Sequence, residues 1–412
     1  MWKLIILLIA LSKILSSPSL EKPLLSLLRT SSPRLHARSE RRPGHRELPR
    51  KQSKEIQMGL LRLLLALAVV VSHCGPSGAG LLCGGRFAVQ TFFMLSGFYM
   101  CLVLTEKYPA GIPGTLRFWK ARARRLLPTY WFALVLSLAC LAIPSAYYFS
   151  PIFTTARFAH AFSISPAPLQ AATAVANLTI FGTDSFLFLA PIDFGMSLPI
   201  DDLHYLLLVP QSWSLAVEAL FYVAAPWLCR ARTTTVIFVM GFSLSARVLL
   251  FATTDASGDP WTYRFFPFEL ALFSAGILSY RAYRHAVQHR RQLLLHPALS
   301  LLPILSFACF TFSSKTEICF WLAYAAIGLS LPSIFRHSSR TPWDKALADL
   351  AYPIYTLHHI VLAFLFPLLV NGAYAPVLPL VTCLSVIACA MLSLRLENQT
   401  ITWLTQGRTR PA

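Results

Sequence analysis

The chain has 412 residues, of which 56% are hydrophobic and only 13% are charged, and its mean hydropathy is +0.58. Apolar stretches long enough to span a bilayer recur from about residue 58 to residue 394, which excludes a soluble protein. The net charge of +19 does not indicate nucleic acid, because 12 of the 36 Lys and Arg precede residue 58 and most others flank apolar stretches. We therefore expect an all-α integral membrane protein whose surroundings are the lipid bilayer.

The N-terminal 57 residues differ from the rest of the chain. The opening stretch "MWKLIILLIALSKIL" has a short apolar core, but no small-residue cleavage site follows, so a signal peptide is not expected. Residues 16–57 are rich in Arg, Pro and Ser and are predicted to be disordered, and Met58 is as good a candidate for the start of the protein as Met1. We expect a basic extension at 1–57, a membrane domain at 58–394 and a short tail at 395–412.

The membrane domain is predicted to contain ten helices. Their spans are 58–76, 86–105, 127–146, 203–228, 234–252, 263–282, 295–313, 317–335, 348–370 and 374–394. If the N-terminus is inside, four basic segments all fall on the cytoplasmic side of the membrane. They are 117–125, 230–232, 281–291 and 336–340. This pattern predicts cytoplasmic N- and C-termini in a multi-pass protein of the cytoplasmic (inner or plasma) membrane. Residues 168–192 are apolar, but an extra crossing would invert every later loop, so we expect an interfacial or re-entrant segment there.

The first span carries two ionisable residues. Arg62 and His73 are eleven residues apart, which is about 20° beyond three helical turns, so they share one face. Their axial separation of about 16.5 Å would place His73 roughly halfway through a hydrocarbon core of ~30 Å. One interpretation is a functional imidazole in a membrane cavity, and the other is a snorkelling arginine with a histidine that bonds a neighbouring helix.

Two arginines precede the third span. Arg122 and Arg125, in "RFWKARARR", have i, i+3 spacing and would lie on one helical face on the cytoplasmic side. Two guanidinium groups on one face suit phosphates, which they bind in a bidentate manner. The alternative is that these residues only mark the cytoplasmic end of a span.

A carboxylate interrupts the fourth span. Glu218, in "QSWSLAVEALFYVAAPW", lies inside this apolar stretch with Ser214 one turn before it. Counted back from Arg230, Glu218 would lie about 18 Å deep, close to the depth estimated for His73. If the two meet, the carboxylate would hold one imidazole nitrogen and leave the other free to accept a proton. The alternative is a structural Glu paired with another helix.

The cysteines give little indication of a function. Nine are scattered without CxxC pairs or histidine partners, so neither a metal site nor a redox motif is expected, although a disulfide between Cys74 and Cys83 is one possibility.

Taken in order, these motifs resemble those of the acyltransferase-3 family of integral membrane O-acyltransferases. The family's Arg-x10-His corresponds to Arg62 and His73, and its "FFxLSGF" signature is present at 92–98. Its RxxR pair corresponds to Arg122 and Arg125, and its "WSLxxExxFY" is present at 213–222 with Glu218. The same 213–222 motif supplies Trp213, Ser214 and Tyr222 as supporting residues. Weaker matches add Arg264, Tyr355 and His358.

The resemblance implies an O-acyltransferase that moves an acyl group, expected to be acetyl, from cytoplasmic acyl-CoA to a hydroxyl of a saccharide or glycoside such as a surface polysaccharide. Arg122, Arg125 and Arg62 would bind acyl-CoA, while His73 and Glu218 would be catalytic, with no bound cofactor or metal. Since 18 residues follow residue 394, a second acyl-transfer step would need a separate downstream protein. The competing interpretation is a proton-coupled transporter that uses the buried His and Glu as a relay.

Overall fold

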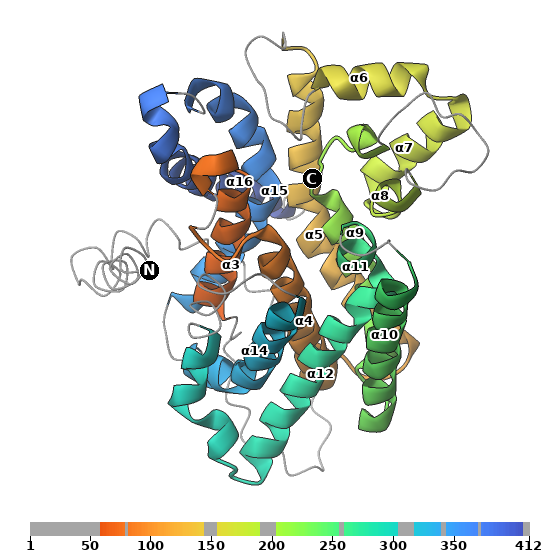
Figure 1. Ribbon diagram of the computed structural model, residues 1–412, viewed down its shortest axis with the longest axis vertical. Coiled ribbons are helices and arrows are strands. Elements are labelled where there is room, and N and C mark those ends of the chain that lie inside the picture. Colours follow the sequence, from red (N-terminus) through yellow and green to blue (C-terminus); the bar gives the residue numbers. More distant parts are fainter. Residues whose placement is uncertain are drawn as a thin grey trace.

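The computed structural model describes residues 58–78, 81–143, 155–189, 203–254, 259–303, 317–338, 343–369 and 372–406. Helices make up the regular structure of these ranges, and none of their residues lies in a strand (Figure 1). The all-α prediction is therefore confirmed for this part of the chain. The predictions for residues 1–57 lie outside the described residues.

Within the described ranges, five helices are long and apolar enough to cross a membrane. They are α4 (Gly85–Glu106), α10 (Thr233–Thr253), α14 (Glu317–Ser338), α15 (Asp344–Leu369) and α16 (Leu378–Gln406). The first helix, α3 (Gly59–Ser72), is also apolar but has only 14 residues. These helices identify a multi-pass membrane protein, whereas the count of ten spans and the cytoplasmic termini stay predictions.

Several boundaries differ from the predicted spans. The helix α5 (Ile112–Cys140) starts well before residue 127, because the segment that carries Arg122 and Arg125 consists mostly of good helix formers and Pro113 lies in its first turn. The helix α9 (Ser212–Leu228) starts after residue 203, where the chain forms a short 3-10 turn. Of the span predicted at 295–313, the described part consists of 3-10 turns.

The segment at 168–192 contains only short elements. The helices α7 (Ala167–Thr179) and α8 (Phe186–Leu189) follow α6 (Thr155–Ile164), and none reaches the length of a span. Residues 168–189 therefore contain no helix of spanning length, and the interfacial or re-entrant location stays a prediction. Cys74 and Cys83 are both buried free thiols, so the possible disulfide between them is not formed.

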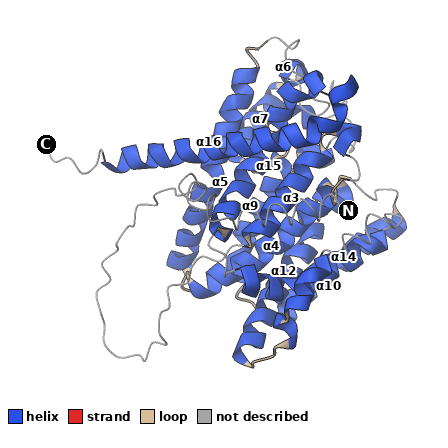
Figure 2. Cartoon of the chain, turned by 90° about the vertical axis from the view of Figure 1, so that its left-hand side faces the viewer, coloured by secondary structure: helices blue, strands red, loops and turns tan. Residues whose placement is uncertain are grey.

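The helix α4 lies at the centre of the bundle. In its most apolar stretch 83% of the residues are buried, against 17% for α10, whose exposed residues include Phe238, Phe242 and Leu249. Such an apolar outer face is suited to lipid. The helix α4 packs against α12 (Phe266–Gln288), α3 and α9, while α3 also packs against α15. In a second view, α16 runs across the bundle and leaves it at its C-terminal end (Figure 2).

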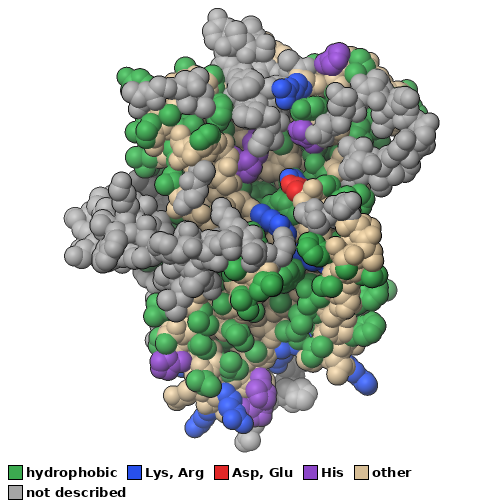
Figure 3. Space-filling view, viewed as in Figure 1, with side chains coloured by type: hydrophobic (Ala, Val, Ile, Leu, Met, Phe, Trp, Pro, Cys, Tyr) green, Lys and Arg blue, Asp and Glu red, His purple; other side chains and the backbone are tan. Residues whose placement is uncertain are grey.

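The visible surface has two kinds of region. Hydrophobic side chains cover much of the lower half of this face, and Lys, Arg and His side chains gather below them at its lower edge (Figure 3). An apolar band beside a basic margin is typical of a membrane protein at the bilayer boundary.

Two glycines allow α4 and α12 to approach closely. A Cβ atom at Gly97 would lie 2.0 Å from the carbonyl oxygen of Phe273, and one at Gly276 would lie 1.9 Å from that of Met94. Small residues at such crossings let helix backbones pack directly against each other in membranes. The Gly in the "FFMLSGF" signature therefore serves the contact between these two helices.

We expect Gly97→Ala to destabilise the protein by about 1–3 kcal/mol, because the added methyl group overlaps backbone atoms that cannot rotate away. Thermal unfolding of the purified protein in detergent measures this effect. The control is Gly241→Ala on α10, where no atom lies within 4 Å of the added Cβ. Equal melting temperatures for Gly97→Ala and Gly241→Ala would contradict the close packing.

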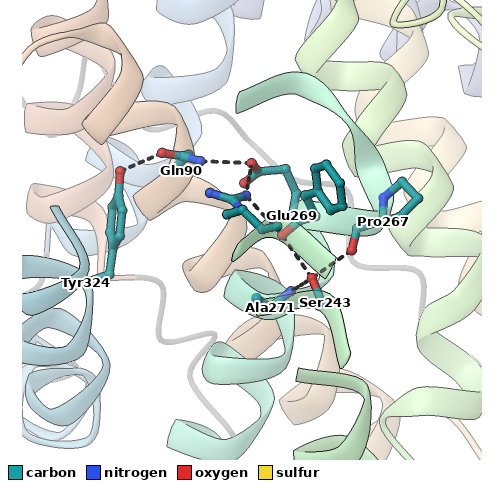
Figure 4. A network of polar contacts seen from close by, with 8 residues as sticks. Gln90, Ser243, Pro267, Glu269, Ala271 and Tyr324 are labelled. Atoms are coloured by element: carbon teal, nitrogen blue, oxygen red, sulfur yellow. Dashed lines mark hydrogen bonds and ion pairs between the residues drawn. The ribbon is translucent and has the colours of Figure 1, made fainter. Parts of the chain in front are cut away.

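A buried ion pair joins the same region to α10 and α14. Arg247 donates to Glu269 Oε1 over 2.8 Å, and Gln90 Nε2 donates to the same oxygen over 2.8 Å (Figure 4). Tyr324 donates to Gln90 Oε1, so one network links side chains from four helices. Charged groups inside a membrane need such partners. The network fixes α4, which carries much of the site described next.

Candidate active site

Two cavities lie on either side of Tyr355. One has a volume of about 80 Å³, is lined by Arg62, Arg122, Arg125 and Glu218 among others, and is called here the arginine cavity. The other has a volume of about 260 Å³, is lined by His73, His359 and Arg264 among others, and is called the histidine cavity. Val89 and Tyr355 line both cavities, so the two spaces are neighbours.

The three arginines predicted to bind acyl-CoA line the arginine cavity together. Arg62 comes from α3, while Arg122 and Arg125 come from one face of α5. The Arg62 guanidinium lies 4.9 Å from the centre of the Tyr99 ring, and that of Arg122 lies 5.9 Å from the Phe118 ring. The structure thus places these residues in one site, although Arg122 and Arg125 lie within a helix rather than before it.

The polar atoms of these arginines are not all used within the protein. The buried Nε of Arg122 has no hydrogen-bond partner. Arg125 is 3.9 Å from Asp349, and its side chain is 38% exposed. Guanidinium groups that line a cavity together suit the oxygen atoms of an anionic group such as a phosphate.

Glu218 belongs to the arginine cavity. Its Oε1 accepts hydrogen bonds from Ser96 over 2.9 Å and from Tyr222 over 2.5 Å. The backbone oxygen of Tyr222 in turn accepts from Trp119 Nε1. The carboxylate is therefore held by α4 and α9, close to the arginines.

His73 lies at the C-terminal end of α3 and faces α15. Its Nδ1 donates to the backbone oxygen of Val69 over 2.8 Å, and its ring centre lies 5.0 Å from that of His358 and 4.6 Å from that of His359. The predicted contact between His73 and Glu218 is not formed, since each lines a different cavity. The physical reason is that α3 packs chiefly against α15, whereas Glu218 points from α9 toward α4 and α5.

The other predicted site residues are divided between the two cavities. The arginine cavity is lined by Ser214 and Tyr222, the histidine cavity by Trp213 and Arg264, and both by Tyr355, while His358 contacts His73. The Arg264 guanidinium stacks on Trp213 at 4.4 Å from the ring centre and forms an ion pair with Asp259. The hydroxyl groups of Ser214 and Tyr355 are 2.5 Å apart, at the boundary between the two cavities. All six supporting residues thus lie in or beside the two cavities.

Three residues of the site were not predicted. His359 contacts both other histidines, Ser96 holds Glu218, and Gln211 donates to the backbone oxygen of Thr356 over 2.5 Å. The doubled histidine in "YTLHH" and the Ser within "FFMLSGF" were visible signals. The role of Gln211 could not be predicted from the sequence, because the Thr356 carbonyl to which it donates is distant along the chain.

The fold and its cavities define a helical membrane protein in which an arginine-lined cavity lies next to a buried histidine cluster. The family model described as "Acyltransferase domain", of the acyltransferase-3 family, matches residues 56–394. The chain therefore belongs to this family, as its motifs had indicated.

Curated relatives agree with this assignment. The O-acetyltransferase OatA of Staphylococcus aureus is 27% identical over 168 residues, which cover 40% of this chain and 23% of the relative. A second relative is YrhL of Bacillus subtilis, which is named as a "putative peptidoglycan O-acetyltransferase". It is 27% identical over 213 residues, which cover 48% of this chain and 28% of the relative. The matched region thus spans about a quarter of these relatives. No solved structure matches the chain.

The separation of Glu218 from His73 leads to a test. Glu218→Gln keeps an oxygen that can accept from Ser96 and Tyr222 but removes the charge, so we expect the pH dependence of acyl transfer to stay that of the wild type. Rates measured across pH with saturating donor check this. Ser96→Ala, which keeps the charge and removes one hydrogen bond, is the matched control. A displaced pH midpoint in Glu218→Gln alone would mean that the carboxylate does act on His73.

Proposed function

We propose that this protein is a membrane O-acyltransferase that moves an acetyl group from acetyl-CoA to a hydroxyl of a saccharide, with a peptidoglycan saccharide as the first candidate acceptor. The observation that carries the proposal is the pair of neighbouring cavities, one rich in arginine and one in histidine, with Tyr355 between them. The family and the names of the two relatives support the reaction class and the acceptor.

The arginine cavity is the proposed donor site. Its volume of about 80 Å³ is too small for a whole nucleotide but suits the narrow acyl-bearing end of a CoA molecule. We place the CoA phosphates beside Arg125, whose side chain is 38% exposed, and the half-buried Arg122, both of which line this cavity. The cytoplasm, which supplies acyl-CoA, is the proposed side of these arginines.

The histidine cavity is the proposed acceptor site. Trp213 and Tyr263 offer aromatic surface, while Gln211, Ser72 and Arg264 offer polar groups, a combination suited to a saccharide. The thioester would have to reach this cavity past Tyr355, whose hydroxyl group and that of Ser214 lie at the boundary.

In the proposed step, His73 is the general base. Its Nδ1 carries the proton that is donated to Val69, so Nε2 has the lone pair. Nε2 takes the proton of the acceptor hydroxyl as that oxygen forms a bond to the thioester carbonyl carbon. The carbon–sulfur bond then breaks, and protonated His73 gives its proton to the departing sulfur, so that CoA leaves as a thiol. The product is an acetyl ester, and His73 ends neutral.

A reconstitution experiment tests this function. Purified protein in nanodiscs is incubated with acetyl-CoA and soluble peptidoglycan fragments, and the products are analysed by mass spectrometry. We expect acetyl esters on the saccharide together with an equal amount of free CoA. Mass spectrometry of cell-surface glycans and small glycosides, with and without the gene, extends the test to other acceptors. If acetyl-CoA neither binds nor is consumed, the proton-coupled transporter becomes the better explanation of the buried His and Glu.

A further inference from the structure

Three histidines form a compact buried cluster. His73 from the end of α3 meets His358 and His359 from α15, and the ring centres of the last two lie 4.3 Å apart. One ring nitrogen from each residue lies within 4.8 Å of those of the other two. His358 is fully buried and His359 is 3% exposed. Three imidazoles that converge inside an apolar bundle need a common partner.

The backbone fixes which nitrogens of two of them face that partner. His73 Nδ1 contacts the Val69 carbonyl over 2.8 Å, and His358 Nδ1 contacts the Tyr355 carbonyl over 2.6 Å. A carbonyl oxygen can only accept, so both Nδ1 atoms carry protons and both Nε2 atoms keep their lone pairs. Metal-binding histidines are typically held in this way, with the other ring N–H donated to a backbone carbonyl.

Two buried nitrogens of the cluster have no hydrogen-bond partner among the described residues. These are His358 Nε2 and His359 Nδ1, both shielded from solvent. A buried polar atom left without a partner destabilises a protein, because it has lost its hydrogen bonds to water. His358 Nε2 carries a lone pair and no proton, so it can only accept. The partner that it lacks is therefore a Lewis acid or a hydrogen-bond donor.

The cluster has an open side. His73 and His359 both line the histidine cavity of about 260 Å³, so a fourth ligand could enter from there. No carboxylate is found among the described residues that line this cavity, and the two arginines that line it are Arg86 and Arg264, the second of which is ion-paired with Asp259. The ligand set is therefore three neutral imidazoles with one free position, which suits borderline-soft divalent metals rather than Ca²⁺ or Mg²⁺.

We propose that His73, His358 and His359 form a binding site for a divalent transition-metal ion of the Zn²⁺ type. Nitrogen ligands of tetrahedral zinc lie about 3.4 Å apart, so the rings must close by on the order of 1 Å when the ion binds. The lone pair of His73 Nε2 cannot bind a metal ion and accept a proton at the same time. If the proposed function holds, metal binding therefore switches off acyl transfer.

Metal binding is tested on the full chain in detergent. The purified protein is stripped with a chelator, loaded with Zn²⁺ and studied by X-ray absorption at the zinc edge. We expect three imidazole nitrogens at about 2.0–2.1 Å. The His359→Cys variant should still bind zinc, with one nitrogen replaced by sulfur at about 2.3 Å, which a merely structural histidine would not produce.

Affinity measurements with matched controls locate the site. Replacement of zinc by Co²⁺ gives visible absorption bands that report four-coordinate binding. His359→Gln should weaken this binding by more than the roughly 10- to 100-fold that changes outside the ligand set typically cause. The control changes His285 and His289 to Gln together, because their rings lie 4.3 Å apart in a more exposed pair on α12. It should leave the bands intact.

The outcomes separate the two proposals. Absence of zinc binding, binding without nitrogen ligands, or binding lost only in the His285/His289 control would overturn the metal site, whatever the acetylation assay shows. If acyl transfer is also measurable, micromolar zinc should inhibit it and a chelator should restore it. A protein that binds zinc as predicted but transfers no acetyl group would refute the proposed function and leave the metal site standing.

Discussion

His73→Ala is expected to abolish acetyl transfer while the protein stays folded and inserted in the membrane. Loss of general-base help typically lowers rates by ~10² to 10⁴. The side chain lines a cavity and has one hydrogen bond, to Val69, so its removal leaves the helix contacts of α3 in place. The measurement is the rate of acetyl ester formation at equal amounts of membrane protein.

The matched control for this change is His160→Ala, an exposed histidine on α6 far from the site in sequence. It should acetylate at the wild-type rate. Near-normal acetylation by His73→Ala would remove this histidine from the mechanism.

Changing Arg122 and Arg125 together to Ala is expected to raise the Michaelis constant for acetyl-CoA by well over tenfold. Hydrogen bonds to charged groups are typically worth about 1.5–3 kcal/mol each, and two guanidinium groups would be lost. Lysine at both positions should restore only part of the affinity, because it keeps the charge but lacks the planar fork. Direct binding of acetyl-CoA in nanodiscs measures the effect.

Arg124→Ala is the control for the arginine pair. Arg124 is exposed on the same helix and does not line the arginine cavity. If this change weakens acetyl-CoA binding as much as the double change does, the arginines act through general charge and not through a defined site.

The sequence predicted best those parts of the site whose residues lie a few positions apart on one helix. The i, i+3 interval of Arg122 and Arg125 placed both on one face, and the structure brings Arg62 to the same cavity. The apolar stretches predicted the all-helical membrane class, because a long apolar run needs no tertiary contact to be recognised. The helix boundaries were less predictable, since α5 continues through a basic segment that hydropathy alone excludes from a span.

The pairing of residues on different helices could not be read in the same way. Equal depth in the membrane suggested that His73 meets Glu218, but depth says nothing about which helices are neighbours. The packing of α3 against α15 instead brings His73 to His358 and His359. The buried pair of Arg247 and Glu269 was missed for the same reason, because 22 positions separate its members on two helices.

The central claim is that the arginine cavity binds the donor while the histidine cavity performs the transfer. One experiment measures both properties, with acetyl-CoA affinity and acetyl ester formation determined on the same nanodisc samples of wild type, His73→Ala and the Arg122→Ala/Arg125→Ala double variant. We predict that His73→Ala binds acetyl-CoA with wild-type affinity but forms no product, whereas the double arginine variant loses the binding itself. Loss of acetyl-CoA affinity in His73→Ala, or wild-type affinity in the double arginine variant, would contradict this division of roles.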